Sequence, residues 1–202
     1  MWHKRPNNFS FRKFNQPGSE KNEYLLINRG EAATIDVSTA CDEVSAILRR
    51  DELQLKYLLI THAHQSHLAA LPKLKADFGA TFCLSRDDHD LLKSSGIQIE
   101  PDRFVKDNAG LKLGDGTIRV LHTPGHTRGS LCFYVKDADI LFSGRTLEKD
   151  GYGTIWGPTS MGWMLISLKR LNGAIHSATV YPGRGESTTM QKEAWLNCLR
   201  SH

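Results

Sequence analysis

Short apolar runs bounded by turn residues recur along the chain and predict β-strands. The predicted strands are Phe9 to Phe14, Glu23 to Asn28, Ala32 to Val37, Leu55 to Ile60, Thr81 to Leu84, one or two within Phe104 to Leu113, Thr117 to His122, Leu131 to Val135, Ile140 to Phe142 and Ala178 to Tyr181. The first of these lies in a polar N-terminal segment, residues 1–21, and we expect it to be an edge strand.

Segments with apolar residues three and four positions apart lie between these strands and predict amphipathic helices. The first predicted helix begins after Thr39 or Asp42 and ends at Arg50. The others run from Leu68 to Phe78 before Gly79, from Asp87 to Lys93, from Met161 to Leu171 and from Thr188 to Leu199. Strands dominate the order, in two runs with helices between them. This order favours an α/β (α+β) fold in which helices lie outside a sandwich of two sheets.

The composition is typical of one soluble domain and narrows the classes of partner. A chain of 202 residues is expected to form a single domain, residues 1–202. The formal charge of +4 comes from dispersed residues, which suits a small anionic ligand better than nucleic acid. The four cysteines form no C-x-x-C pair, and no segment resembles a signal peptide or a membrane span. We therefore expect a cytoplasmic protein with reduced thiols.

Three histidines follow directly after the predicted strand Leu55 to Ile60. They are His62, His64 and His67, spaced at i, i+2 and i+5. Side chains at i and i+2 share a face of an extended chain, and the residue at i+5 can reach them from the first turn of the next helix. A lone histidine is more often a hydrogen-bonded core or surface residue. Three that converge at a strand end indicate ligands of a metal ion.

Four loop motifs make the sequence similar to a known family. They are Thr61–His67, His122–Ser130, Leu141–Leu147, and Tyr181–Gly185 followed by Thr188 and Thr189. Over roughly Asn22 to Glu193, the chain resembles the metallo-β-lactamase superfamily in its short glyoxalase II-like (hydroxyacylglutathione hydrolase-like) branch. The resemblance implies an αββα sandwich of two mixed β-sheets flanked by helices, with a metal centre at the edge where these loops meet.

The resemblance also implies two metal positions, of which this sequence keeps one. His62, His64 and His126 match the ligands of the first position, which we call the three-histidine site. His67 is the remnant of the second. Other family positions are substituted: Ser66 for an Asp, Arg145 for the bridging Asp, Arg184 for the final His, and Thr154 and Trp156 for a nearby Arg and Asp. A guanidinium has no lone pair to donate, so we expect at most one Zn²⁺ or other divalent ion per chain, with an empty site as the alternative.

Two functions are compatible with this combination of residues. In the first, favoured by the missing carboxylates, the site is degenerate, the protein is a pseudoenzyme, and Arg145 and Arg184 bind a small anionic ligand or partner. In the second, one zinc ion at the three-histidine site hydrolyses a small ester or thioester, and either arginine stabilises the substrate anion. A third possibility gives the arginines only structural ion pairs. The nearby acids are Glu148, Asp150 and Glu186.

Overall fold

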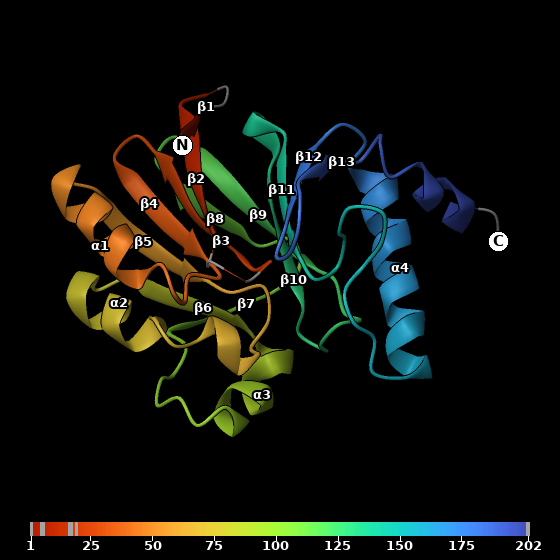
Figure 1. Ribbon diagram of the computed structural model, residues 1–202, viewed down its shortest axis with the longest axis horizontal. Helices are drawn as coiled ribbons and strands as arrows, with labels where there is room; N and C mark the ends of the chain where they lie inside the picture. Colours follow the sequence, from red (N-terminus) through yellow and green to blue (C-terminus); the bar gives the residue numbers. More distant parts are fainter. Residues whose placement is uncertain (1, 5–6, 16–17, 19, 201–202) are drawn as a thin grey trace.

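The computed structural model describes residues 2–4, 7–15, 18 and 20–200, and these form two mixed β-sheets packed face to face with helices on both outer sides (Figure 1). The predicted αββα sandwich is confirmed. One sheet has the strand order β1-β2-β3-β4-β5-β6-β7, and the other has the order β13-β12-β11-β10-β9-β8.

In the first sheet the strands at one side pair antiparallel and the others parallel, whereas the second sheet is antiparallel except for one internal parallel pair. The strands of the first sheet are β1 (Trp2–Lys4), β2 (Phe9–Asn15), β3 (Asn22–Asn28), β4 (Glu31–Ile35), β5 (Gln54–Leu59), β6 (Thr81–Ser85) and β7 (Arg103–Val105). Those of the second are β8 (Gly110–Leu113), β9 (Gly116–His122), β10 (Leu131–Val135), β11 (Ile140–Gly144), β12 (Thr179–Pro182) and β13 (Thr188–Thr189). Strands β4 to β7 are parallel neighbours, and so are β11 and β12.

Helices cover the outer face of each sheet (Figure 1). Helices α1 (Cys41–Arg50), α2 (Leu71–Phe78) and α3 (His89–Ser94) lie on the first sheet, α4 (Pro158–Ala174) lies on the second, and short 3-10 helices occur at Gln65–His67, Arg86–Asp88, Lys136–Ala138 and Ala194–Arg200. Helix α2 ends at Gly79 with a φ of 64°, a left-handed conformation that favours glycine. Among the described residues, no helix combines the length and apolar composition that a membrane span needs.

Apolar side chains of the strands pack in three hydrophobic layers, one between the two sheets and one between each sheet and its helices. Along β3, Tyr24 and Leu26 pack between the two sheets, whereas Leu25 packs beneath α1 and α2. In β11, Phe142 faces the first sheet and Leu141 packs with α4. Because successive side chains of a strand point to opposite faces, a strand buried on both faces must be apolar throughout. The layers hold the strand ends firmly and so position the loops that follow them.

The N-terminal strand forms but is not at the edge of its sheet, which corrects the prediction. Strand β2 pairs with β3 on one side and with Trp2–Lys4 on the other. Phe9, Phe11 and Phe14 are buried on its two faces. Alternating aromatic residues on both faces are what an interior strand requires, and this pattern outweighs the polar composition around it.

The helix predicted from Thr188 to Leu199 is wrong over its first half. Thr188 and Thr189 form β13 against β12, and helical structure begins only at Ala194, as a 3-10 helix. The Met190 N–H continues the strand pairing by donating to the carbonyl of residue 178. β-Branched threonines fit a pleated strand better than a helical turn, because their χ1 freedom is restricted in a helix.

Candidate metal centre

His62, His64 and His126 come together on the loops that follow β5 and β9. The nitrogens that the three rings offer all lie within 4.8 Å of one another, although His64 and His126 are 62 positions apart in sequence. Nε2 of His126 is 3.1 Å from Nδ1 of His64. Two nitrogens bound to one tetrahedral zinc ion at ordinary bond lengths would be about 3.3 Å apart. The spacing of the rings therefore suits a shared divalent ion.

In His62 and His126, a hydrogen bond at one ring nitrogen determines which nitrogen keeps its lone pair. Nδ1 of His126 lies 2.8 Å from the carbonyl oxygen of Thr154, and a carbonyl only accepts, so Nδ1 carries the proton. Nδ1 of His62 is 3.0 Å from Oγ1 of Thr61, whose own proton is donated to Oδ2 of Asp36 at 2.7 Å. Nδ1 of His62 is then also a donor. Nε2 of both rings keeps its lone pair, as metal-ligating histidines require.

The site keeps its imidazoles neutral. Burial, followed by repulsion from the neighbouring imidazoles, lowers the pKa of His62 well below its ordinary value. Burial lowers the pKa of His126 to about 4, and it also lowers the pKa of His64. A metal ion binds only the neutral form of imidazole, so the free lone pairs are available at neutral pH.

The sequence matches the model of the metallo-beta-lactamase superfamily over residues 19–188. The chain belongs to this superfamily. It is 31% identical over 157 residues to hydroxyacylglutathione hydrolase from Francisella tularensis subsp. novicida, an alignment that covers 76% of this chain and 59% of that protein. The chain thus spans less than two thirds of the length of that relative. The glyoxalase II-like resemblance is confirmed by this similarity.

Solved structures of metallo-β-lactamase-fold proteins superimpose on nearly the whole chain. BLEG-1 B3 metallo-beta-lactamase gives a TM-score of 0.80 at 25% identity, over 95% of this chain and 100% of that one. TTHA1623, solved in a di-iron-bound form, gives a TM-score of 0.74 at 26% identity, over 91% of this chain and 96% of that one. The superfamily thus includes a neighbour whose structure holds two metal ions.

In this superfamily member, the residues at the second metal position are a poor set of donors. The ring of His67 is buried, with its centroid 4.5 Å from that of His62, and burial lowers its pKa. Ser66 and Arg184 are exposed. Within the described part of the chain, His62, His64 and His126 are the one group of three or more His, Cys, Asp or Glu side chains placed to hold an ion. The three-histidine site could therefore hold a metal ion, whereas the positions that the resemblance assigns to a second ion offer one imidazole, that of His67.

Arg145 is held in an ion pair beside the three-histidine site. Its guanidinium contacts the carboxylate of Glu148, and both side chains are largely shielded from solvent, with 12% and 19% exposed. Burial raises the pKa of Glu148, and the guanidinium opposes that shift. The expectation that Glu148 is an ion-pair partner is confirmed, whereas Glu186 pairs with Lys149. The positive charge of Arg145 is thus paired with a carboxylate, and it still helps to lower the pKa values of His62, His64 and His126.

Buried Asp88 joins the two histidine loops, and sequence reasoning missed it. Its Oδ2 accepts hydrogen bonds from the N–H of Ala63 at 3.0 Å and from Oγ1 of Thr127 at 2.9 Å. Its Oδ1 accepts from the N–H of Gly129 at 2.7 Å. Ala63 lies between the first two histidines, and Thr127 follows the third. Asp88 lies in a charged run that is typical of an exposed helix start, so the sequence carried no signal of this role.

Asp36 was also missed, although the sequence did carry a signal. It follows β4 directly and is fully buried, where it accepts hydrogen bonds from both the N–H and the hydroxyl of Thr61. A charged residue inside an otherwise apolar predicted strand must find polar partners, because an unpaired buried charge is costly. The position of Asp36 before an apolar residue was therefore a sign of a supporting role in the site.

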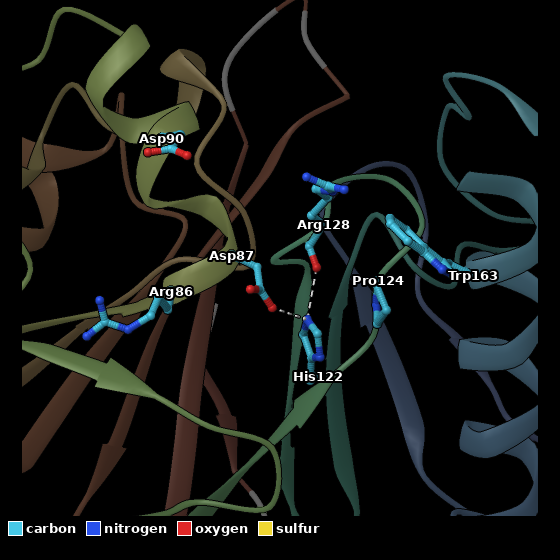
Figure 2. Close-up of a pocket in the computed structure, with 7 residues that line it drawn as sticks. All are labelled: Arg86, Asp87, Asp90, His122, Pro124, Arg128 and Trp163. Carbon is cyan, nitrogen blue, oxygen red and sulfur yellow. Dashed lines mark hydrogen bonds and ion pairs between the residues drawn. The ribbon is translucent and has the colours of Figure 1, made fainter. Parts of the chain in front are cut away.

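Two adjoining pockets open beside the three-histidine site. The first, of about 550 Å³, is lined by His64 and His126 together with Leu91 and Trp156. The second, of about 430 Å³, is lined by residues drawn in Figure 2 and shares Asp87, Asp90 and Arg128 with the first. Neither Arg145 nor Arg184 lines either of these two pockets.

Arg128 lies on the rim that the two pockets share. Its guanidinium carbon is 5.6 Å from the centre of the Trp163 ring, and its carbonyl oxygen is 2.9 Å from Nε2 of His122. Figure 2 shows this guanidinium pointing away from His122, while Asp87 points toward it. His122 thus forms a hydrogen bond within its own loop. Arg128 is an exposed cation next to the site, and sequence reasoning did not single it out.

Proposed function

We propose that this protein is a hydrolase that uses one divalent metal ion and acts on a small ester or thioester. The observation that carries the proposal is the convergence of three neutral imidazoles, two of which have their far nitrogens fixed as donors by Thr61 and Thr154. An ion held by three imidazoles with an open fourth position lowers the pKa of bound water and polarises a carbonyl group. The similarity to hydroxyacylglutathione hydrolase supports a thioester as the substrate class.

The pocket next to His64 and His126 is the proposed substrate site, with Arg128 as the group that binds a substrate anion. Arg128 is exposed, and no described carboxylate forms an ion pair with it. A guanidinium presents several donors in one plane, which suits a carboxylate or phosphate group. This assignment moves the anion-binding role from Arg145 and Arg184, which stay outside the two pockets, to Arg128.

A second candidate function is binding without turnover. It is favoured by the substitutions at Ser66, Arg145 and Arg184, which leave no carboxylate at the positions where the family places acids. In this case the same pocket binds a small anionic ligand, and the metal site is degenerate. Two ions per chain are not expected under either function, because guanidinium groups cannot coordinate a metal.

Metal analysis combined with turnover separates these functions. Protein purified without chelator and then loaded with Zn²⁺ should hold one ion per chain and hydrolyse members of a panel of small thioesters and esters. His126→Ala should lose both the ion and the activity. The matched control is His176→Ala, which removes an exposed histidine outside the site and should keep both.

The alternative outcomes are equally specific. One ion or none, no turnover, and saturable binding of small carboxylates or phosphates would support the binding function. Two ions per chain in the wild-type protein would refute the single-ion proposal. Full zinc binding by His126→Ala would refute the three-histidine site itself.

A further inference from the structure

Trp156 lies beside the three-histidine site with most of its surface uncovered. Its side chain is 67% exposed, and its ring centroid is 6.4 Å from the ring centroids of both His64 and His126. It also lines the pocket of about 550 Å³. Tryptophan is highly buried on average, because exposing its large ring to water is unfavourable. An uncovered indole at the edge of a site is apolar surface that a ligand can cover.

Packing of the protein itself does not account for Trp156. Two neighbours in the same segment, Tyr152 and Ile155, pack against the hydrophobic layer beneath α4, whereas Trp156 takes no part in any of the three layers. The indole of Trp156 instead faces the rings of two metal-site histidines.

The rest of the pocket lining restricts which ligand can use this surface. Apart from Trp156, the one apolar lining residue is Leu91, and the others are polar or charged: His64, Asp87, Asp88, Asp90, Ser94, His126, Thr127, Arg128 and Ser160. A long alkyl chain needs a continuous apolar wall, which this lining does not provide. A planar ring needs one flat apolar face and can direct its edge toward polar neighbours.

We propose that Trp156 is a specificity-determining residue that selects substrates with an aromatic acyl group. This inference rests on the proposed hydrolase function. A carbonyl group placed near His64 and His126 puts the acyl ring within reach of the indole, because the indole lies beside both histidines. The leaving group then extends toward the adjoining pocket, past Arg128.

The reaction is a simple hydrolysis. The acyl carbon–sulfur bond breaks, or the carbon–oxygen bond of an ester, and the oxygen of water forms the new bond to the acyl carbon. One proton of water goes to the leaving thiolate or alkoxide, and the other leaves the new carboxylic acid. The products are an aromatic carboxylate and a thiol or alcohol, with no change of oxidation state.

The test compares Trp156→Ala and Trp156→Phe with the wild-type protein in two measurements. The first is calorimetric binding of benzoate and 2-naphthoate, which mimic the product, against propionate and hexanoate. The second is kcat/KM for benzoyl and propionyl thioesters of the same thiol. The matched control is Ile166→Ala, since Ile166 is 65% exposed on α4 and lines neither pocket.

Trp156→Ala should weaken aryl carboxylate binding about tenfold, equivalent to about 1.4 kcal/mol, and should reduce the benzoyl preference by a similar factor. Trp156→Phe should keep most of the aryl carboxylate affinity and most of the benzoyl preference. Ile166→Ala should change aryl carboxylate binding less than about twofold, and alkyl carboxylate binding should change less than about twofold in every variant. Equal benzoate binding by wild type and Trp156→Ala would overturn the inference. Hydrolysis with no aryl preference would overturn it while leaving the proposed function intact. Aryl binding that depends on Trp156 without any hydrolysis would support the aromatic site and refute the hydrolase.

Discussion

Replacing Asp88 should weaken metal binding and fold stability together, because one buried carboxylate holds both histidine loops. Asparagine has nearly the same shape but only one acceptor oxygen. If that oxygen takes the place of Oδ2, the bonds to Ala63 and Thr127 remain, and the new amide N–H₂ faces the N–H of Gly129. With the amide turned the other way, the bonds to Ala63 and Thr127 would both be lost. We therefore expect the orientation that keeps them. One charge-assisted bond is lost, and both the N–H of Gly129 and the new amide N–H₂ are left without an acceptor.

The size of the effect follows from the number of bonds. A hydrogen bond to a charged group contributes about 1.5–3 kcal/mol net, so Asp88→Asn should lower the free energy of unfolding by about 2–3 kcal/mol. Asp88→Ala removes all three bonds and should cost about 4.5 kcal/mol or more, which is the lower end of three such contributions. Loss of a residue that supports metal ligands typically lowers metal affinity about 10–100-fold. We expect Asp88→Ala near the upper end of that range and Asp88→Asn near the lower end.

Urea unfolding of the metal-free protein measures the stability change, and competition with a chelating dye measures zinc affinity. Asp90→Asn is the matched control, because Asp90 is an exposed neighbour on α3. Asp88→Asn with wild-type stability and wild-type zinc affinity would refute the role of the carboxylate. A large loss of stability in Asp88→Ala with unchanged zinc affinity would show that Asp88 supports the fold but not the position of the ligands.

Two substitutions and one labelling experiment test other contacts of the site and the core. Thr61→Val removes the hydroxyl that orients the first histidine, so zinc affinity in dye competition should fall about tenfold, whereas Thr61→Ser should retain it. Glu148→Gln leaves its guanidinium partner unpaired near the ion and should lower zinc affinity at least tenfold, unlike Glu186→Gln at an exposed pair. Burial raises the pKa of Cys83 to about 12 and that of Cys132 to about 11, so about one thiol in a thousand or fewer is ionised at pH 8. A disulfide reagent should label these two only after unfolding, and labelling of the native protein within minutes would contradict their burial.

The sandwich could be predicted from the sequence because its strands are buried on both faces. Such strands contain continuous apolar runs, as in residues 24–27 of β3, and they stand out from the amphipathic helices around them. The three-histidine site could also be predicted, because a ligand needs a particular residue type at a particular strand end. His126 joins His62 and His64 as the loop motifs imply. Both features depend on residue identity at fixed positions.

Contacts that depend on side-chain direction could not be predicted. A motif fixes where the backbone of Arg145 and Arg128 lies, but a long flexible side chain can point several ways. Glu148 decides the direction of the first, and the ring of Trp163 lies against the second. The role of Asp88 depends on two loops that meet only in the folded chain, so no local pattern announced it.

The pairing of Arg145 with Glu148 bears on our prediction that one metal ion binds at the three-histidine site although Arg145 and Arg184 are close in sequence to the family's metal positions. A free guanidinium about 6 Å from a divalent ion would repel it by roughly 5 kcal/mol at an effective dielectric constant of about 20. With a carboxylate in direct contact, the guanidinium would act on the ion as one end of a dipole, so the repulsion is smaller than that of a free guanidinium. Arg184 is exposed, so solvent and salt screen its charge. Zinc binding at protein sites is worth on the order of 10 kcal/mol, which exceeds the repulsion that remains. We therefore expect that substitution by arginine removes the second ion without preventing the first.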